Sequence, residues 1–270
     1  QTQDTAPKGD PFDNDPTAAR LWYDVRLCLG FLTRIPVFSI EYSRHRTLAG
    51  ASWAFPVVGA FVGLVGALVL WLANEFGLAS QMAAVLAIAS MIMLTGALHE
   101  DGLADTADGF GLGGDVEKRL SAMRDPRIGV FGMVALMVAF TARWVALSDL
   151  TAISLGEGAA ALIAAAAISR GVLPYIMQTV RSARQDGLGA TAGQPESRTA
   201  TIALGIAGVA ALFAFGFGGA IVVLVVVGLI SYLLVAIAKR LIGGQTGDVL
   251  GAIQQACEVA VLVTAAGLAA

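Results

Sequence analysis

The stretch Thr199–Ala238, TATIALGIAGVAALFAFGFGGAIVVLVVVGLISYLLVAIA, contains no charged side chain over 40 residues. A membrane-spanning helix needs about 20 largely apolar residues, because the hydrocarbon core is about 30 Å thick and each helical residue rises about 1.5 Å. The stretch is therefore long enough for two spans. The glycine cluster at its middle, Gly216, Gly218 and Gly219, predicts the turn between them.

Other parts of the chain contain five further apolar runs with the length of a span. They cover residues 53–73, 76–98, 128–147, 158–180 and 249–270. We therefore expect an all-α integral membrane protein with about seven transmembrane helices.

Three of these runs hold one charged residue each: Arg143, Arg170 and Glu258. Glu258 would lie roughly 15 Å deep, since it stands about ten residues into its run. A carboxylate at that depth needs a partner or a watery cavity. We expect Arg143 or Arg170 to be that partner; a protonated, purely structural Glu258 is the alternative.

The composition excludes two classes of protein. Hydrophobic residues make up 57 % of the chain, charged residues only 14 %, and the mean hydropathy is +0.75. A nucleic-acid binder with a basic face and a disordered chain both need more charge. The two cysteines, Cys28 and Cys257, share no motif with each other or with a histidine, so we interpret them as small apolar residues.

The basic residues predict how the chain is oriented. Fifteen of the 17 lie before the first span or in the connections that follow the second, fourth and sixth spans. The other connections hold none. Because positive charge collects on the cytoplasmic side of a membrane, this alternation predicts a cytoplasmic N-terminus and an outer C-terminus.

The chain is expected to consist of a tail and one domain. Residues 1–20 are polar and carry three prolines, which predicts a disordered tail. Residues 21–270 are predicted to form a single polytopic membrane domain. After the tail, apolar residues recur at helical spacing up to Pro36, in a run too short to span. A helix on the inner membrane surface and an ordinary helix packed on the bundle fit this pattern equally well. The apolar residues that recur in this run are Leu21, Val25, Cys28, Leu29 and Leu32.

The candidate chemistry begins in the connection after the second span, with the sequence HEDGLADTADG from His99 to Gly109. On a helix, Asp101, Asp105 and Asp108 would fall within about 60° of one another, so that one face carries three carboxylates. No Lys or Arg lies between them to relieve the repulsion. Such a face suits a hard divalent cation such as Mg²⁺, which takes carboxylate oxygens, waters and substrate phosphates. A solvated acidic face is the alternative.

Several other polar residues could complete such a site. A short cytoplasmic helix is predicted over residues 116–124. Two arginines lie at or near the end of this helix, and two more lie at the end of the fourth span. These four arginines are either candidates for binding phosphate or membrane-side anchors. Asp248 follows a glycine-rich turn and could be a further metal ligand. His99 is either an interfacial histidine or a base. The four candidate phosphate-binding arginines are Arg124, Arg127, Arg181 and Arg184.

Five motifs together resemble the cobalamin synthase family, whose members are adenosylcobinamide-GDP ribazoletransferases. The resemblance runs from about Leu21 to the C-terminus. Pro126 is a mild departure from the family pattern, and Gln245 stands at a variable position. The motifs are FLTRIP (31–36), FPVVG (55–59), HEDGLADTADG (99–109), MRDPRIG (123–129) and GGQTGDVLGA (243–252).

The resemblance implies a multi-pass enzyme of the bacterial inner membrane with a cytoplasmic active site. It implies a Mg²⁺-dependent reaction that joins adenosylcobinamide-GDP to α-ribazole, or to its 5′-phosphate, and releases GMP. On this hypothesis Asp101, Asp105, Asp108 and Asp248, with Glu100, are the metal ligands, and the four arginines hold substrate phosphates. The catalytic candidates are Asp105, Asp108 and His99, and one of the last two takes the hydroxyl proton.

Two other functions stay open at this point. Buried ionisable residues would suit a transporter of small molecules or ions. The acidic spacing also resembles the metal motif of CDP-alcohol phosphotransferases, which make phospholipids. The lipid bilayer is an expected partner and nucleic acid is not, while the sequence leaves a homo-oligomer open.

Overall fold

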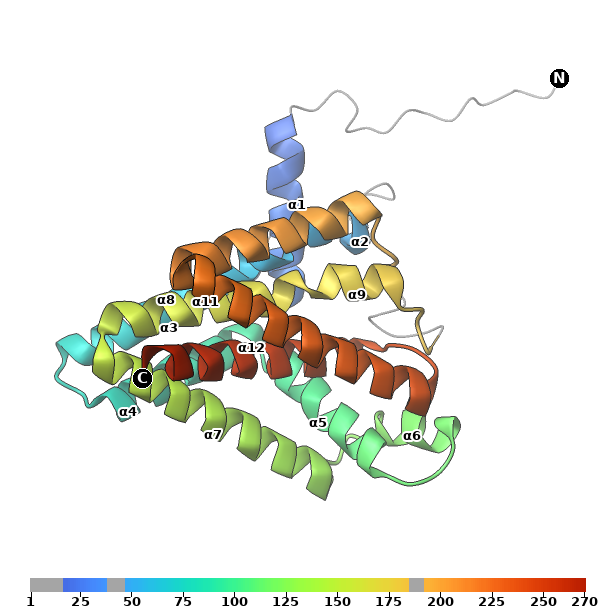
Figure 1. Cartoon of the computed structure of the whole chain (residues 1–270). Helices are drawn as coiled ribbons and strands as arrows, with labels where there is room; N and C mark the ends of the chain where they lie inside the picture. The colour runs from blue at the N-terminus through green and yellow to red at the C-terminus, as the bar shows by residue number, and fades with distance from the viewer. Residues whose placement is uncertain (1–16, 38–46, 185–191) are drawn as a thin grey trace.

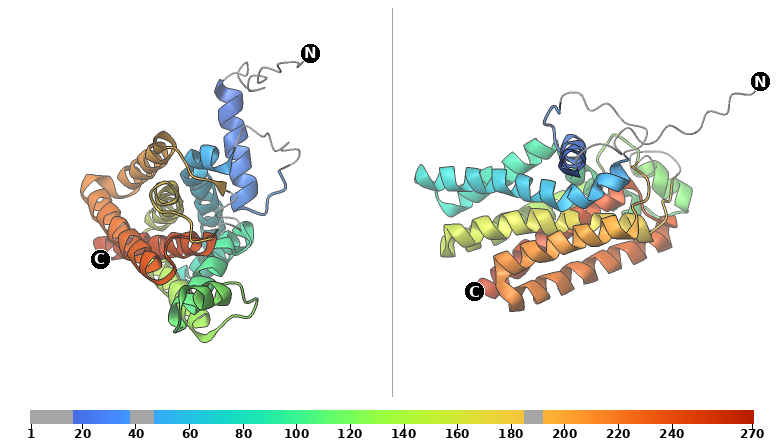
Figure 2. Two further views of the ribbon diagram at one scale, coloured as in Figure 1. Left: turned by 90° about the vertical axis from the view of Figure 1, so that its right-hand side faces the viewer. Right: turned by 90° about the horizontal axis from the view of Figure 1, so that it is seen from above.

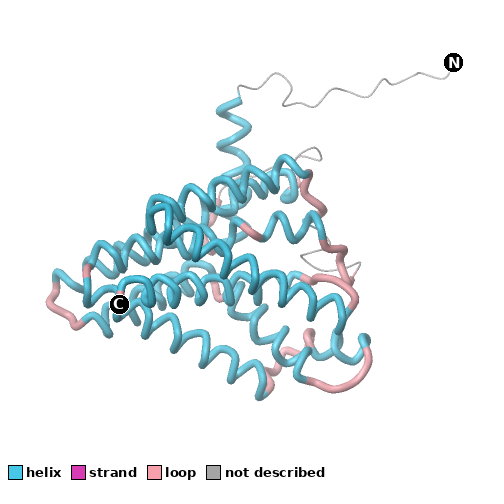
Figure 3. Tube along the Cα trace, viewed as in Figure 1, coloured by secondary structure: helices cyan, strands magenta, loops and turns pink. Residues whose placement is uncertain are grey.

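The computed structural model describes residues 17–37, 47–184 and 192–270, and these residues form helices and loops without a β-strand (Figure 3). The first helices are α1 (Thr17–Leu32), α2 (Leu48–Ala51), the 3₁₀ turn η1 (Ser52–Ala54), α3 (Phe55–Glu75), α4 (Ser80–Thr95) and α5 (Leu98–Gly111). They are followed by α6 (Val116–Ala122), α7 (Val130–Ile153), α8 (Leu155–Gly171), α9 (Leu173–Thr179), α11 (Ser197–Ile242) and α12 (Gly247–Ala269). The prediction of an all-α protein is confirmed.

The long helices form a bundle with a common direction, and α1 runs across it (Figures 1 and 2). The interior helix is α8, whose residues 164–171 are all buried. It is alanine-rich, and small side chains let neighbouring backbones approach closely. Gly59 and Gly63 of α3 show this, because a Cβ on either would meet the backbone of α8. The bundle is therefore held together by small-residue contacts.

In the part of the chain that the structure describes, five helical segments are long and apolar enough to cross a membrane: 48–75, 130–153, 155–179, 197–242 and 247–269. The pair α4 and α5 would be a sixth, although it is bent by 88°. The chain is therefore a multi-pass membrane protein. The total of seven transmembrane helices stays a prediction. In this count α11 is a single segment, although a kink divides it into two arms.

That kink lies where the glycine cluster predicted a turn. Gly216 has φ 63° and ψ −178° within the 46 residues of α11, a conformation that glycine adopts without the steric cost of a Cβ. The two arms of α11 then run side by side in opposite directions (Figure 2). The predicted turn between two apolar segments is confirmed.

The run predicted as the second span, residues 76–98, folds differently. Its helix α4 has 16 residues, about 24 Å of helix and less than the hydrocarbon thickness. Gly96 and Ala97 then take positive φ angles of 64° and 58° and turn the chain into α5. The acidic motif thus begins a new helix rather than continuing the span.

Helix α1 begins at Thr17, and residues 1–16 of the predicted tail lie outside the described residues. Its C-terminal half packs on the bundle through Leu27, Cys28 and Leu32, whereas Leu21 and Trp22 are exposed. The observed buried face is therefore shifted from the predicted one, which began at Leu21. The predicted packing of α1 on the bundle is confirmed for its C-terminal half, and its placement on the membrane surface stays a prediction.

Candidate functional site

The site lies at the end of the bundle that is opposite the C-terminus, where α5 and the start of α12 meet (Figure 1). The two helices cross at Gly102 and Gly251. A Cβ on Gly102 would lie 2.8 Å from the carbonyl oxygen of Asp248, and one on Gly251 would lie 3.3 Å from the Cα atoms of Gly102 and His99. Glycine at this crossing therefore brings the acids of α5 close to Asp248.

A pocket of about 1000 Å³, its open mouth included, borders this crossing. Its polar lining comes from α5, from the segment after α9 and from the start of α12, and includes His99, Asp101, Arg184 and Asp248. Its apolar lining comes mainly from α1, α2, α3 and α9, and includes Phe31 and Phe55, whose rings stack with centroids 6.4 Å apart. We call it the polar pocket.

Carboxylates from α5 and α12 come close together at the crossing. Asp105 interacts electrostatically with Asp101, Asp108 and Asp248, all of which repel it, and with Arg184, which attracts it. Arg184 donates from Nη1 to Asp248 Oδ2 over 3.3 Å and from Nη2 to the Leu120 carbonyl oxygen over 2.8 Å. The described cations relieve only part of this negative charge.

Asp108 faces the start of α7 instead. Its Oδ2 accepts a hydrogen bond of 2.7 Å from the Gly129 N–H, and its Oδ1 accepts one of 2.9 Å from the Gly132 N–H. These are N–H groups that a helix N-terminus leaves without intrahelical partners. The structure thus gives Asp108 a task that the spacing did not reveal, which is to fix α7 to α5.

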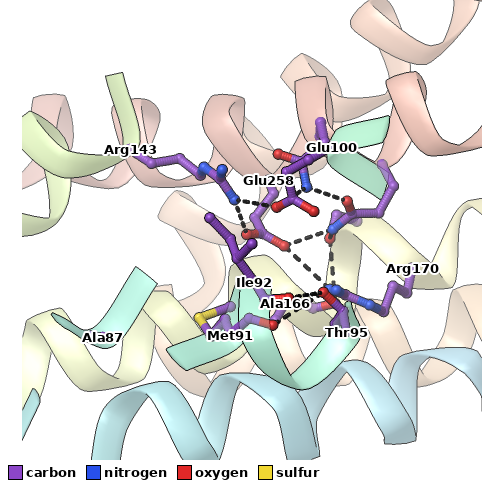
Figure 4. A network of polar contacts seen from close by, with 12 residues as sticks. Ala87, Met91, Ile92, Thr95, Glu100, Arg143, Ala166, Arg170 and Glu258 are labelled. Carbon is purple, nitrogen blue, oxygen red and sulfur yellow. Dashed lines mark hydrogen bonds and ion pairs between the residues drawn. The ribbon is translucent and has the colours of Figure 1, made fainter. Parts of the chain in front are cut away.

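Glu100 belongs to a buried cluster that we call the ion network (Figure 4). Its Oε1 accepts from Arg143 Nη1 over 3.3 Å and from Gln255 Nε2 over 3.1 Å. The network is defined by Glu100, Arg143, Ser169, Arg170, Gln254, Gln255 and Glu258, which come from α5, α7, α8 and α12. Glu100 is therefore tied into the bundle and does not line the polar pocket.

Glu258 has both predicted cations as partners, not one of them. Its Oε1 lies 3.2 Å from Arg143 Nη1, and its Oε2 lies 3.2 Å from Arg170 Nη1. Gln254, on the same helix, donates to Oε2 over 2.6 Å. Glu258 is thus held as an ion-paired carboxylate, and the alternative of a protonated residue is not needed.

The four predicted phosphate-binding arginines separate into two groups. Arg184 lines the polar pocket, and Arg124 is close enough to Asp248 to attract its charge. Arg127 pairs with Asp125 over 2.8 Å at the surface, and this pair holds the pKa of the Asp125 carboxyl at about 2, mainly through its hydrogen bonds. Arg181 donates to the Gly243 carbonyl oxygen over 3.0 Å and ties the segment after α9 to the turn before α12.

His99 is buried and lines the polar pocket. Its Nδ1 has no hydrogen-bond partner among the described residues, and the charges of Arg170 and Arg143 act on the ring. It therefore lies between the ion network and the pocket. Arg119 of α6 donates to the carbonyl oxygens of Gly109 and Phe110, over 3.2 and 2.8 Å, and caps the end of α5.

The donor chemistry of the crossing fits Mg²⁺. Among the described residues, no three His, Cys, Asp or Glu side chains are arranged to hold a metal ion by themselves. Mg²⁺ does not require such a cage, since it is commonly bound by one or two carboxylates, several waters and the phosphates of a substrate. Asp101, Asp105 and Asp248 offer oxygen ligands with excess negative charge, which is the donor set that this ion prefers.

The fold and the site together define a multi-pass membrane protein with a charged pocket at one end of its bundle. The chain matches the family model described as cobalamin-5-phosphate synthase over residues 24–266. It belongs to that family, and it is a transferase of cobalamin biosynthesis.

Curated relatives agree with this assignment. A protein of Mesorhizobium japonicum named adenosylcobinamide-GDP ribazoletransferase is 47 % identical over 242 residues, which cover 90 % of this chain and 92 % of that protein. A protein of the same name from Bradyrhizobium diazoefficiens is 44 % identical over 243 residues, or 90 % and 93 % of the two chains. No solved structure matches the chain.

Proposed function

We propose that the protein joins adenosylcobinamide-GDP to α-ribazole, or to α-ribazole 5′-phosphate, and releases GMP. The names of the relatives support the two substrates. In this reaction a ribose hydroxyl oxygen bonds to the phosphorus attached to cobinamide. The bond from that phosphorus to the GMP oxygen breaks, and the hydroxyl proton passes to a base.

Asp101, Asp105 and Asp248 would hold Mg²⁺, and Glu100 and Asp108 would position the helix that carries two of them. When bound, the ion would neutralise negative charge on the diphosphate and on the departing GMP. The carboxylates lie on two helices, α5 and α12, so the glycine crossing between these helices sets their separation.

Arg184 and Arg124 are the arginines best placed to bind substrate phosphate. Arg184 already spans from Asp248 to the Leu120 carbonyl oxygen, so its guanidinium is fixed before a substrate arrives, and a fixed guanidinium loses little freedom on binding. The apolar wall with Phe31 and Phe55 would contact the uncharged parts of the substrates.

His99 is our candidate for the group that takes the hydroxyl proton. It lines the polar pocket, whereas both oxygens of Asp108 already accept backbone hydrogen bonds. Burial, and then the charges of Arg170 and Arg143, disfavour an imidazolium, so the ring is neutral and has a nitrogen lone pair. The choice of His99 as the base rests on its position in the pocket.

We further propose that this end of the bundle faces the cytoplasm of a bacterial inner membrane. The connections with basic residues lie at the site end, and the connections without them lie with the C-terminus at the other end (Figure 1). A cytoplasmic site would also meet a nucleotide-activated substrate where nucleotides are made.

The observation that carries the proposal is that His99, Asp101, Arg184 and Asp248 line one pocket. In detergent, the protein should release GMP from adenosylcobinamide-GDP only when α-ribazole and Mg²⁺ are both present. Transport cannot occur in detergent, so GMP release excludes a transporter. CDP-alcohols with lipid acceptors should give no product; turnover of these would indicate a phospholipid enzyme.

The Asp105→Asn variant tests the carboxylates. It should insert into the membrane normally and lose Mg²⁺-dependent turnover by about 100-fold or more, because removal of one group acting on transition-state charge costs about that factor. Glu117→Gln removes an exposed acid of α6 and should leave the rate unchanged. Near-normal turnover of Asp105→Asn would reject the metal role.

A further inference from the structure

Arg34 lies in the motif FLTRIP, which has no role in the site described above. It follows the end of α1 in a short segment with fixed geometry. The Thr33 hydroxyl donates to the Leu29 carbonyl oxygen over 2.6 Å and accepts from the Ile35 N–H over 3.2 Å. The Arg34 N–H donates to the Leu94 carbonyl oxygen over 2.8 Å. The segment after α1 is thereby fixed to the end of α4.

The side chain of Arg34 lies against the bend between α4 and α5. At Gly96, the residue with φ 64°, a Cβ would overlap Nε of Arg34. Glycine at this position therefore serves two needs at once: it permits the left-handed conformation of the bend, and it leaves room for the guanidinium. A membrane-side anchor would need neither.

Arg34 also borders the acidic helix. A second pocket, lined by Thr33, Arg34, Thr95 and the 96–98 bend, shares Phe31, Leu98 and Asp101 with the polar pocket. Asp101 thus stands between two pockets, with Arg184 on one side and Arg34 on the other. In contrast to Arg127 and Arg184, Arg34 makes no side-chain hydrogen bond or ion pair with any part of the chain that the structure describes.

We propose that Arg34 binds a phosphate of the diphosphate in the nucleotide-activated substrate, from the side of Asp101 opposite to Arg184. A guanidinium offers two parallel N–H donors to phosphate oxygens, and one cation on each side would hold the two phosphates of a diphosphate. The proposal rests on the proposed function, because it assigns a residue to the diphosphate of adenosylcobinamide-GDP.

The test compares Arg34→Gln, Arg34→Lys and the matched control Arg198→Gln, which removes an exposed arginine of α11 that borders neither pocket. Arg34→Gln should raise KM for adenosylcobinamide-GDP by about 10-fold to 100-fold, the range for losing a hydrogen bond to a charged group. KM for α-ribazole should change by less than about twofold, which is below the effect of a typical single hydrogen bond. Arg34→Lys should fall between the two, since it keeps the charge but loses the paired donors.

A second readout needs no turnover. Binding of adenosylcobinamide-GDP without α-ribazole, measured by calorimetry in detergent, should weaken in Arg34→Gln and not in Arg198→Gln, while the thermal unfolding temperatures of the variants stay equal. Unchanged affinity and KM for adenosylcobinamide-GDP in folded Arg34→Gln, or an equal rise of KM for both substrates, would overturn the proposal. Failure of the proposed function looks different: the wild-type protein itself would then form no condensation product.

Discussion

Glu258 illustrates how a single residue organises the interior of this bundle. Its side chain is 2 % exposed and joins Arg143 and Arg170, and Arg143 in turn contacts Glu100 of α5. The two arginines and two glutamates balance in charge. Because a buried ion pair stabilises little but is costly to break, the network serves mainly to specify how α5, α7, α8 and α12 fit together.

The Glu258→Gln variant should therefore be strongly destabilised. It leaves Arg170 buried without its only acidic partner in the network, and removal of one member of a buried pair costs about 3–5 kcal/mol of unfolding free energy. Thermal unfolding in detergent measures the effect, with exposed Glu157→Gln as the control. Equal stability of the two variants would show that Glu258 is not charged in the folded protein.

Arginine substitutions should separate the site from the surface. Arg184→Gln should raise KM for adenosylcobinamide-GDP by about tenfold or more, because a charge-assisted hydrogen bond is lost. Arg127→Gln should have no such effect, since Arg127 contacts Asp125 at the surface. Steady-state kinetics of the two variants decide the matter, and a larger effect at Arg127 would contradict our placement of the phosphates.

At the scale of elements, the decisive contact is the crossing of α5 and α12. Gly102→Ala adds a methyl group 2.8 Å from the Asp248 carbonyl oxygen, so the helices must separate. We expect a higher Mg²⁺ concentration for half-maximal activity, because the proposed ligands lie on both helices. Gly205→Ala, where a Cβ meets nothing within 4 Å, is the control, and an unchanged Mg²⁺ requirement in Gly102→Ala would argue against a shared site.

Elements also show what the sequence could and could not predict. The helices, the Gly216 turn and the clustering of acids followed from apolar run length and 3.6-residue spacing. The bend at Gly96 and Ala97 did not, because an alanine with positive φ has no local sequence signal. The second partner of Glu258 and the Asp108 bonds to α7 join residues far apart in the chain, and such pairings depend on tertiary packing.

The whole molecule presents two ends, which we expect to face opposite sides of the membrane. The native cysteines, Cys28 and Cys257, are both buried, and burial raises the pKa of the Cys28 thiol, which disfavours the reactive thiolate. Single cysteines introduced elsewhere can therefore be labelled selectively. A membrane-impermeant maleimide should label Gly77→Cys in intact spheroplasts, and Gly113→Cys only after the membrane is opened. The reverse pattern would place the site outside.

The most direct measurement of the central claim uses Mn²⁺ in place of Mg²⁺. With GMP bound to the detergent-solubilised protein, electron–nuclear double resonance should show hyperfine coupling between Mn²⁺ and the ³¹P nucleus of GMP. The account predicts that this coupling disappears in Asp101→Asn and Asp248→Asn and persists in Glu117→Gln. Coupling that survives in both aspartate variants, or that is absent from the wild-type protein with GMP bound, would contradict a metal–phosphate site at the crossing of α5 and α12.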